Sequence, residues 1–168
     1  MSSRRGPELS SAFQRIRAPV LPRIGVMADA LPPLDAAWLQ TQFDAIAAGF
    51  VKQLGLRIES AERGHVVLTL PVADGLVHGG GVLCGQAILA AADTAILLAL
   101  LAQLGEFKPM TTVQLQASFL RPVAKGSPPL RVDSRILRSG KRLSYGEVGF
   151  ATADGKLVAH ATSTYSLL

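Results

Sequence analysis

The sequence predicts an α+β fold in which an antiparallel sheet of five or six strands wraps around one long apolar helix. The helix is expected over Gly85–Leu104, where Asp93 is the only formal charge. Because such a helix is apolar on every side, every side of it must be covered. Helical and strand-like segments do not alternate along the chain, which argues against a doubly wound parallel sheet. A curved antiparallel sheet that holds the helix is therefore the favoured architecture.

A membrane is the other way to cover an apolar helix, and the length of Gly85–Leu104 would allow it to span one. Asp93 near the middle argues against a span, as do Gln86 and Gln103. The segment also lacks the flanking basic residues that set the orientation of a spanning helix. We therefore expect no membrane partner.

The remaining elements are predicted from periodicity and turn residues. Apolar spacing predicts an amphipathic helix over residues 35–54, with Asp35 as its N-cap and Gly55 at its end. Alternating runs predict two strands before the apolar helix and four after it, with the Asp154-Gly155 dipeptide as a hairpin turn. The expected strands cover residues 56–60, 65–72, 110–120, 130–137, 143–152 and 156–165. We expect them to form one meandering antiparallel sheet.

The charged residues are unevenly distributed along the 168 residues, whose net charge is +5. Residues 1–26 hold five arginines and one glutamate. Residues 121–142 hold seven basic side chains and one acidic side chain, and the rest of the chain is acidic overall. Because residues 27–168 are nearly neutral as a whole, we expect no nucleic-acid partner.

The length favours a single domain, which we place at residues 35–168 after an N-terminal extension of residues 1–34. The extension is expected to be disordered or weakly ordered. Its Arg and Ser bias loosely resembles an organellar transit peptide, but we favour a disordered extension or translated sequence upstream of a start at Met27. The extension lacks the apolar stretch of a secretory signal. The chain has a single cysteine, Cys84, so an internal disulfide is excluded. We expect a cytoplasmic protein.

Asp93 is the outstanding candidate for chemistry. Burying an unpaired carboxylate among alanine and leucine side chains would cost several kcal/mol. No basic residue lies three or four positions away on either side, so the helix itself supplies no partner. A distant arginine would make Asp93 structural, whereas a water-lined cleft would make it functional. We favour the cleft.

A glycine-rich loop over residues 73–84 precedes the apolar helix. Its glycines allow the backbone to approach a ligand, and Gly81 is our candidate for substrate contact. The first amides of the helix, those of Gly85 and Gln86, are placed to form an oxyanion hole. The alternative is a loop whose glycines only satisfy turns. Neither a dinucleotide-binding motif nor a P-loop fits these spacings, so no nucleotide cofactor is expected.

Nucleophilic and metal sites are poorly supported by the remaining residues. No G-x-S-x-G motif is present, and no Cys/His group has zinc spacing, so we expect no metal and no cofactor. Cys84 is expected to be a small buried side chain, and His65 and His160 to be ordinary surface or core histidines. His78, which opens the glycine loop, is an equally good site residue or loop residue.

Several short motifs in a fixed order resemble the PaaI-like acyl-CoA thioesterases, which have the hotdog fold. The resemblance covers about residues 48–165. Its motifs are the segment 79–85, the run 91–95 around Asp93, the strand end 118–122, the turn 138–141 and the hairpin 154–159. One departure is visible, because Cys84 stands where the family has a histidine and Gln86 where it has a second glycine. The His78-Gly79-Gly80 run lies one loop earlier.

The resemblance implies hydrolysis of an acyl-CoA thioester. Asp93 would act as general base or as nucleophile, and the Gly85 and Gln86 amides would stabilise the oxyanion. His78 and Thr112 would position the substrate carbonyl and water. The phosphates of coenzyme A would meet a basic cluster in the strand region that follows: Arg138, Lys141 and Arg142. An ordinary solvated strand surface is the equal alternative for this cluster.

The resemblance also implies a homodimer, often paired again into a tetramer. Gln86 and Asp93 lie seven residues apart, roughly 10 Å along one helix axis. Two antiparallel helices across a dimer bring such groups together more readily than one helix does. A non-catalytic module that binds acyl-CoA or an acyl carrier is the alternative on the same fold. A hotdog dehydratase is disfavoured because no histidine lies in Gly85–Leu104.

Overall fold

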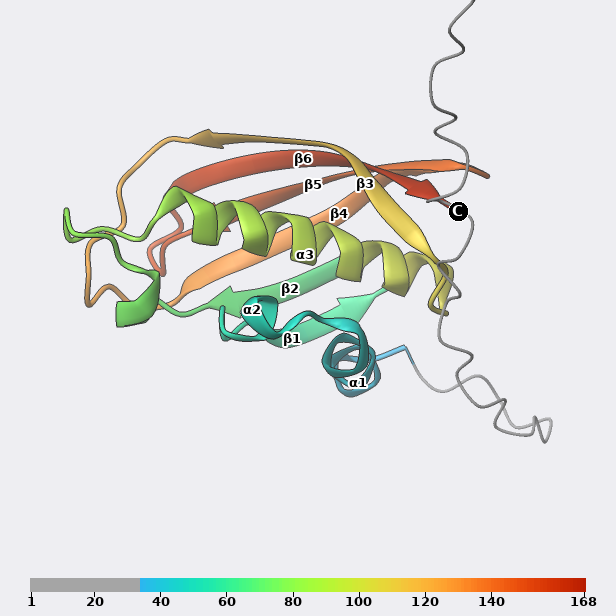
Figure 1. The fold of residues 1–168 in the computed structure, drawn as a ribbon, viewed down its shortest axis with the longest axis horizontal. Coiled ribbons are helices and arrows are strands. Elements are labelled where there is room, and N and C mark those ends of the chain that lie inside the picture. Colours follow the sequence, from blue (N-terminus) through green and yellow to red (C-terminus); the bar gives the residue numbers. More distant parts are fainter. Residues whose placement is uncertain (1–33) are drawn as a thin grey trace, which may run out of the picture. The chain divides into compact units, whose positions relative to one another are not determined.

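A six-stranded antiparallel sheet carries one long helix, α3, on one of its faces (Figure 1). The computed structural model describes residues 34–168, so the predicted extension lies outside the described residues apart from Leu34. The helices are α1 (Ala36–Ile46), α2 (Gly49–Lys52) and α3 (Gly85–Leu104), with a short 3-10 turn at Asp74–Leu76. The strands are β1 (Arg57–Glu62), β2 (His65–Leu70), β3 (Met110–Phe119), β4 (Leu130–Ser139), β5 (Leu143–Ala151) and β6 (Leu157–Leu167).

The helix α3 is the core of the fold and has the predicted bounds. Twelve of its residues are buried, because the inner face of the sheet, which we define as the face that packs against α3, covers it. Gly105 ends the helix in the left-handed conformation, at φ 72°. By length and composition α3 could cross a membrane, yet 67% of its most apolar stretch is buried within this fold. Its apolar character is thus explained by its place in the core.

The N-terminal helix is shorter than predicted. The Asp35 side chain accepts a hydrogen bond from the Trp38 amide at 2.8 Å, which confirms the N-cap. The helix nevertheless stops at Ile46, and Ala47 and Ala48 are extended before the one-turn helix α2. The prediction of one helix over residues 35–54 was therefore wrong. The break falls at Ala47 and Ala48, although alanine is the best helix former, so intrinsic helix propensity does not explain it.

The strand order is β1-β2-β4-β5-β6-β3, so the sheet is not a simple meander. The crossover through α3 carries the chain over the inner face to the far side of β6 (Figure 1). As a result β3 pairs with β6 alone and forms an edge of the sheet. Most of its residues are exposed, among them Val113 at 59%. Strand periodicity does not encode neighbour order, which is why the expected meander was wrong for β3.

Candidate active site

Three elements converge on Asp93, in the middle of α3. Thr112, near the start of β3, donates a hydrogen bond to Asp93 Oδ1 at 3.0 Å and approaches Oδ2 at 3.3 Å. Tyr165, on β6, donates to Oδ1 at 2.5 Å and lies 2.8 Å from the Asp93 carbonyl oxygen. Thr112 and Tyr165 are direct partners in the β3–β6 register. Their pairing explains how residues 19 and 72 positions from Asp93 reach one carboxylate.

The partners of Asp93 are neutral hydroxyls. Among residues 34–168 no lysine, arginine or histidine forms an ion pair with its carboxylate. Asp93 is half-buried, whereas Tyr165 is 2% exposed. Burial, followed by the negative charge of Asp93, raises the pKa of Tyr165 well above its ordinary value. The phenol therefore keeps its proton and remains a donor.

Tyr165 was missed in the sequence analysis, which predicted Asp93 and Thr112. Its side chain points to the inner face of the sheet, as do those of Ala161 and Ser163 on the same strand. A tyrosine among small inward residues must find a partner for its hydroxyl when it is buried. That pattern was the available signal, but the identity of the partner depends on strand order.

The N-terminus of α3 lacks a side-chain cap. Cys84 makes no side-chain capping bond, and its carbonyl accepts only from Ala87 and Ile88. Within the described residues, the Gly85 and Gln86 amides donate to no backbone carbonyl outside the helix. Cys84 is half-buried rather than fully buried.

A cavity of about 230 Å³ lies beside this helix end. Its lining is mostly apolar and includes Leu83, Ile88, Phe119 and Val123. The Phe119 ring covers Gly85 so closely that a Cβ there would lie 3.3 Å from the ring. Gly85 and Asp93 are eight positions apart, about 12 Å along the helix axis. A single α3 therefore does not present both groups to one carbonyl.

The glycine loop forms a tight turn closed by His78. The His78 Nδ1 atom accepts a hydrogen bond from the Gly80 amide at 2.9 Å, and the His78 carbonyl accepts one from Gly81 at 2.9 Å. Gly81 has φ 77°, a conformation that favours glycine. The Gly81 carbonyl accepts from Lys125 at 2.8 Å, which ties the turn to the loop after β3. The structure thus gives His78 and Gly81 contacts within the loop, and none with Asp93 among the described residues.

The predicted phosphate-binding residues gather around a second cavity, of about 450 Å³. Arg138, Lys141 and Arg142 line it, together with Tyr145 and Thr164. None of the three basic side chains forms an ion pair within residues 34–168.

This cavity opens on the outer face of the sheet, the face turned away from α3. Tyr145 and Thr164 are cross-strand partners, and Gly146, the next residue on β5, faces Ile96 of α3. Because successive strand residues point to opposite faces, Tyr145 and Thr164 point outward. The structure brings the basic cluster together but places it across the sheet from Asp93.

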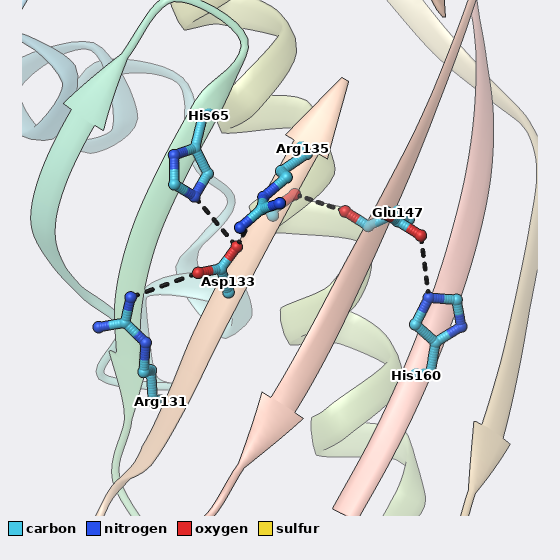
Figure 2. A network of polar contacts seen from close by, with 7 residues as sticks. His65, Arg131, Asp133, Arg135, Glu147 and His160 are labelled. Carbon is cyan, nitrogen blue, oxygen red and sulfur yellow. Dashed lines mark hydrogen bonds and ion pairs between the residues drawn. The ribbon is translucent and has the colours of Figure 1, made fainter. Parts of the chain in front are cut away.

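A polar network covers the centre of the outer face (Figure 2). Asp133 accepts from His65 at 3.0 Å, from Arg135 at 3.2 Å and from Arg131 at 3.3 Å. Burial alone would raise the pKa of Asp133, but the hydrogen bond and charge of His65, with those of the arginines, hold it below its ordinary value. Figure 2 also shows His160 on β6 directed at Glu147 on β5, at 3.3 Å.

Both histidines of this network have carboxylate partners far from Asp93 across the sheet. The structure thus gives His65 and His160 partners on the outer face and no contact with Asp93. Among residues 34–168, no group of three His, Cys, Asp or Glu side chains is placed to hold a metal ion.

Comparisons with known proteins agree with this architecture. A model of the thioesterase superfamily matches residues 75–159. The protein SSO2140 of Saccharolobus solfataricus, named as an inferred esterase, is 32% identical over 70% of this chain and 81% of its own length.

Solved structures of similar proteins include a thioesterase and two further proteins. The thioesterase HI1161 of Haemophilus influenzae is 25% identical, with a TM-score of 0.69 over 77% of this chain and 90% of that one. The PaaI protein of Escherichia coli, from a phenylacetic acid degradation operon, is 22% identical, with a TM-score of 0.69 over 79% and 94% of the two chains. The protein smu.793 of Streptococcus mutans, bound to acetyl CoA, is 24% identical, with a TM-score of 0.62 over 67% and 88%.

The sheet that holds α3 agrees with the hotdog fold of these structures. Because these relatives are an esterase and a thioesterase, the chain belongs to a family of hydrolases. Since the family model spans residues 75–159 of the 168, and the Saccharolobus relative shares 32% identity over 70% of the chain, the protein belongs to the thioesterase superfamily and has the hotdog fold of the PaaI-like proteins.

Proposed function

We propose that the protein hydrolyses acyl-CoA thioesters to a free acid and coenzyme A. The observation that carries the proposal is a half-buried carboxylate, Asp93, in an otherwise uncharged helix, fixed by the hydroxyls of Thr112 and Tyr165. A side chain held in one orientation without an opposing charge is suited to take a proton or attack a carbonyl. The acetyl CoA bound by the similar Streptococcus mutans protein supports the choice of thioester.

Two routes are open to the Asp93 carboxylate. As a general base, it takes a proton from water while the water oxygen attacks the thioester carbonyl carbon; the C–S bond then breaks and coenzyme A leaves as its thiol after protonation. As a nucleophile, a carboxylate oxygen attacks the same carbon, the thiolate leaves, and water hydrolyses the resulting anhydride. Both routes pass through an oxyanion that two backbone amides can stabilise.

The complete site is proposed to form between two copies of the chain, as a homodimer or a dimer of dimers. The distance along α3 between Gly85 and Asp93 supports this proposal, and so does the unpaired β3 edge. Two β3 strands paired antiparallel would run their α3 helices in opposite directions. Asp93 of one copy then faces the Gly85 and Gln86 amides of the other, with Thr112 positioning the water.

The remaining predicted residues would bind the substrate. We propose that three basic side chains bind the phosphates of coenzyme A: Arg138, Lys141 and Arg142. A cluster of this size suits a small anionic partner rather than nucleic acid or a membrane. Because their cavity lies on the outer face, the coenzyme A arm would pass an edge of the sheet to bring its thioester to Asp93. His78 and Gly81 would shape the loop at the substrate carbonyl. We propose that this chemistry takes place in the cytoplasm.

The test is hydrolysis of an acyl-CoA panel by Asp93→Asn and Asp93→Ala, followed with a thiol reagent. Loss of the base or nucleophile is expected to lower kcat by about 10²- to 10⁴-fold. Glu59→Gln is the matched control, because Glu59 is an exposed acid on the far edge strand β1. It should retain wild-type turnover.

Unchanged turnover in both Asp93 variants would contradict the assignment. A folded wild-type protein that binds acyl-CoA but hydrolyses no chain length would instead identify a non-catalytic binding module.

A further inference from the structure

We infer that Tyr165 is a positioning residue for the reaction: its hydroxyl occupies Oδ1 of Asp93 and leaves Oδ2 as the oxygen that meets water or the thioester. The inference rests on the proposed function of Asp93. It adds a residue to the site and distinguishes the two oxygens of the carboxylate.

The hydrogen bonds around the carboxylate are unevenly shared. Oδ1 receives the Tyr165 hydroxyl at 2.5 Å and the Thr112 hydroxyl at 3.0 Å. Oδ2 has only the longer approach of the same Thr112 hydroxyl, at 3.3 Å. Each oxygen of an ionised carboxylate can accept about two hydrogen bonds, so Oδ1 is filled and Oδ2 keeps acceptor capacity.

Tyr165 is far better fixed than Thr112. Its side chain is 2% exposed, and its backbone is paired with Thr112 on one side and with Ser144 of β5 on the other. A buried ring in a paired strand cannot swing away without opening the core. Thr112 belongs to the exposed edge strand β3. The orientation of Asp93 is therefore set mainly by the phenol.

A neutral donor has a particular advantage for this role. A cation at the same place would pair with the carboxylate and weaken it as a base or nucleophile. The phenol fixes the carboxylate without adding an opposing charge. Because burial and the charge of Asp93 raise the pKa of Tyr165, the hydroxyl stays protonated across the working pH range.

The experiment compares Tyr165→Phe with the wild type in kcat, KM and the pH profile of kcat/KM. Losing a hydrogen bond to a charged group is expected to lower kcat by about 10- to 100-fold with KM little changed. The acidic limb of the profile should move to higher pH, because a donor to the charged form is lost.

Ser163→Ala is the matched control. Ser163 is the preceding inward residue of β6, is fully buried, and donates to the Gln114 carbonyl at 2.8 Å, away from Asp93. It should leave the acidic limb of the profile in place. A purely structural role for Tyr165 would lower the melting temperature in both variants and move the limb in neither, which would overturn the inference.

A second variant keeps the inference testable if Tyr165→Phe does not fold. Difluorotyrosine at position 165 retains the shape of the side chain and makes the phenol a stronger donor. It should move the acidic limb to lower pH, and an unmoved limb would overturn the inference.

Different results would contradict the proposed function and the role of Tyr165. Full activity of the Asp93 variants would refute the proposed function. Inactive Asp93 variants together with a wild-type profile for Tyr165→Phe would refute only the role of Tyr165.

Discussion

Thr112 holds the accessible side of the Asp93 carboxylate. Its hydroxyl spans both carboxylate oxygens, and its side chain belongs to the exposed edge strand. Thr112→Val preserves the branched shape and removes the donor. We expect kcat to fall by about 5- to 10-fold, since one exposed hydrogen bond to a charged group is lost.

Thr112→Ser is the control, because serine restores the hydroxyl without the methyl group. It should recover most of the lost rate in a steady-state acyl-CoA assay. Equal losses in the valine and serine variants would mean that the methyl group is needed as well as the hydroxyl, and unchanged kcat in Thr112→Val would contradict the role of the hydroxyl.

The sequence and the family resemblance singled out Asp93 and Thr112, which the structure brings into contact, but they did not single out Tyr165. A lone charge in an apolar helix is visible in the residue string itself, and the family resemblance supplied Thr112. The contact between Tyr165 and Asp93 joins positions 72 apart and depends on β6 lying beside β3. For His78, the position in the loop could be predicted from the sequence. The hydrogen bond that its ring accepts from the Gly80 amide could not, because it depends on the geometry of the turn.

At the level of elements, the contact between α3 and β5 is unusually close at Gly146. A Cβ there would lie 2.8 Å from Ile96 Cγ2 and 3.0 Å from the Arg135 carbonyl oxygen. Gly146→Ala therefore forces the helix and the sheet apart. Overpacking of this kind is expected to lower the free energy of unfolding by about 1–3 kcal/mol. Chemical denaturation of the purified variant measures the change.

Gly149→Ala is the matched substitution on the same strand. Its added Cβ would lie 3.4 Å from Leu157 Cδ1, an ordinary contact. It should unfold close to the wild type. A similar loss in both variants would show that strand glycine, and not the approach of α3, controls stability.

The elements themselves were largely predictable, and their arrangement was not. α3 has its predicted bounds, and Gly105 in the left-handed conformation ends it. The break after Ile46 and the edge position of β3 depend on tertiary packing, for which local periodicity holds no signal.

For the molecule as a whole, the exposed β3 edge is the expected dimer contact. Val113, 59% exposed, lies at the register shift of this strand. A lysine on an edge strand opposes strand pairing, so Val113→Lys should shift the protein toward monomer and lower its activity. Analytical ultracentrifugation and the acyl-CoA assay measure both effects together.

Glu59→Lys introduces the same side chain on β1, at the opposite edge of the sheet. It should preserve both the assembly and the rate. A fully active Val113→Lys monomer would contradict a site shared between two copies.

The distribution of charge was only partly readable from the sequence. Five of the seven basic residues in segment 121–142 form two groups in the fold, whereas Lys125 pairs with Asp74 and Arg121 donates to the Leu157 carbonyl. Arg131 and Arg135 are engaged by Asp133 on the outer face, whereas the cluster around the 450 Å³ cavity has no acidic partner within residues 34–168. Strand alternation predicts that Arg131, Asp133 and Arg135 share one face of β4, but the contact of His65 with Asp133 depends on the register of β4 with β2.

The position of Tyr165 has a practical consequence for handling the protein. The strand that holds it ends at Leu167, and the following Leu168 amide donates to the Pro109 carbonyl just before β3. Removing residues 165–168 would therefore take away both the phenol that contacts Asp93 and a backbone hydrogen bond beside the start of β3. Kinetic constants from preparations that a protease has trimmed on this side should not be pooled with those from untrimmed ones.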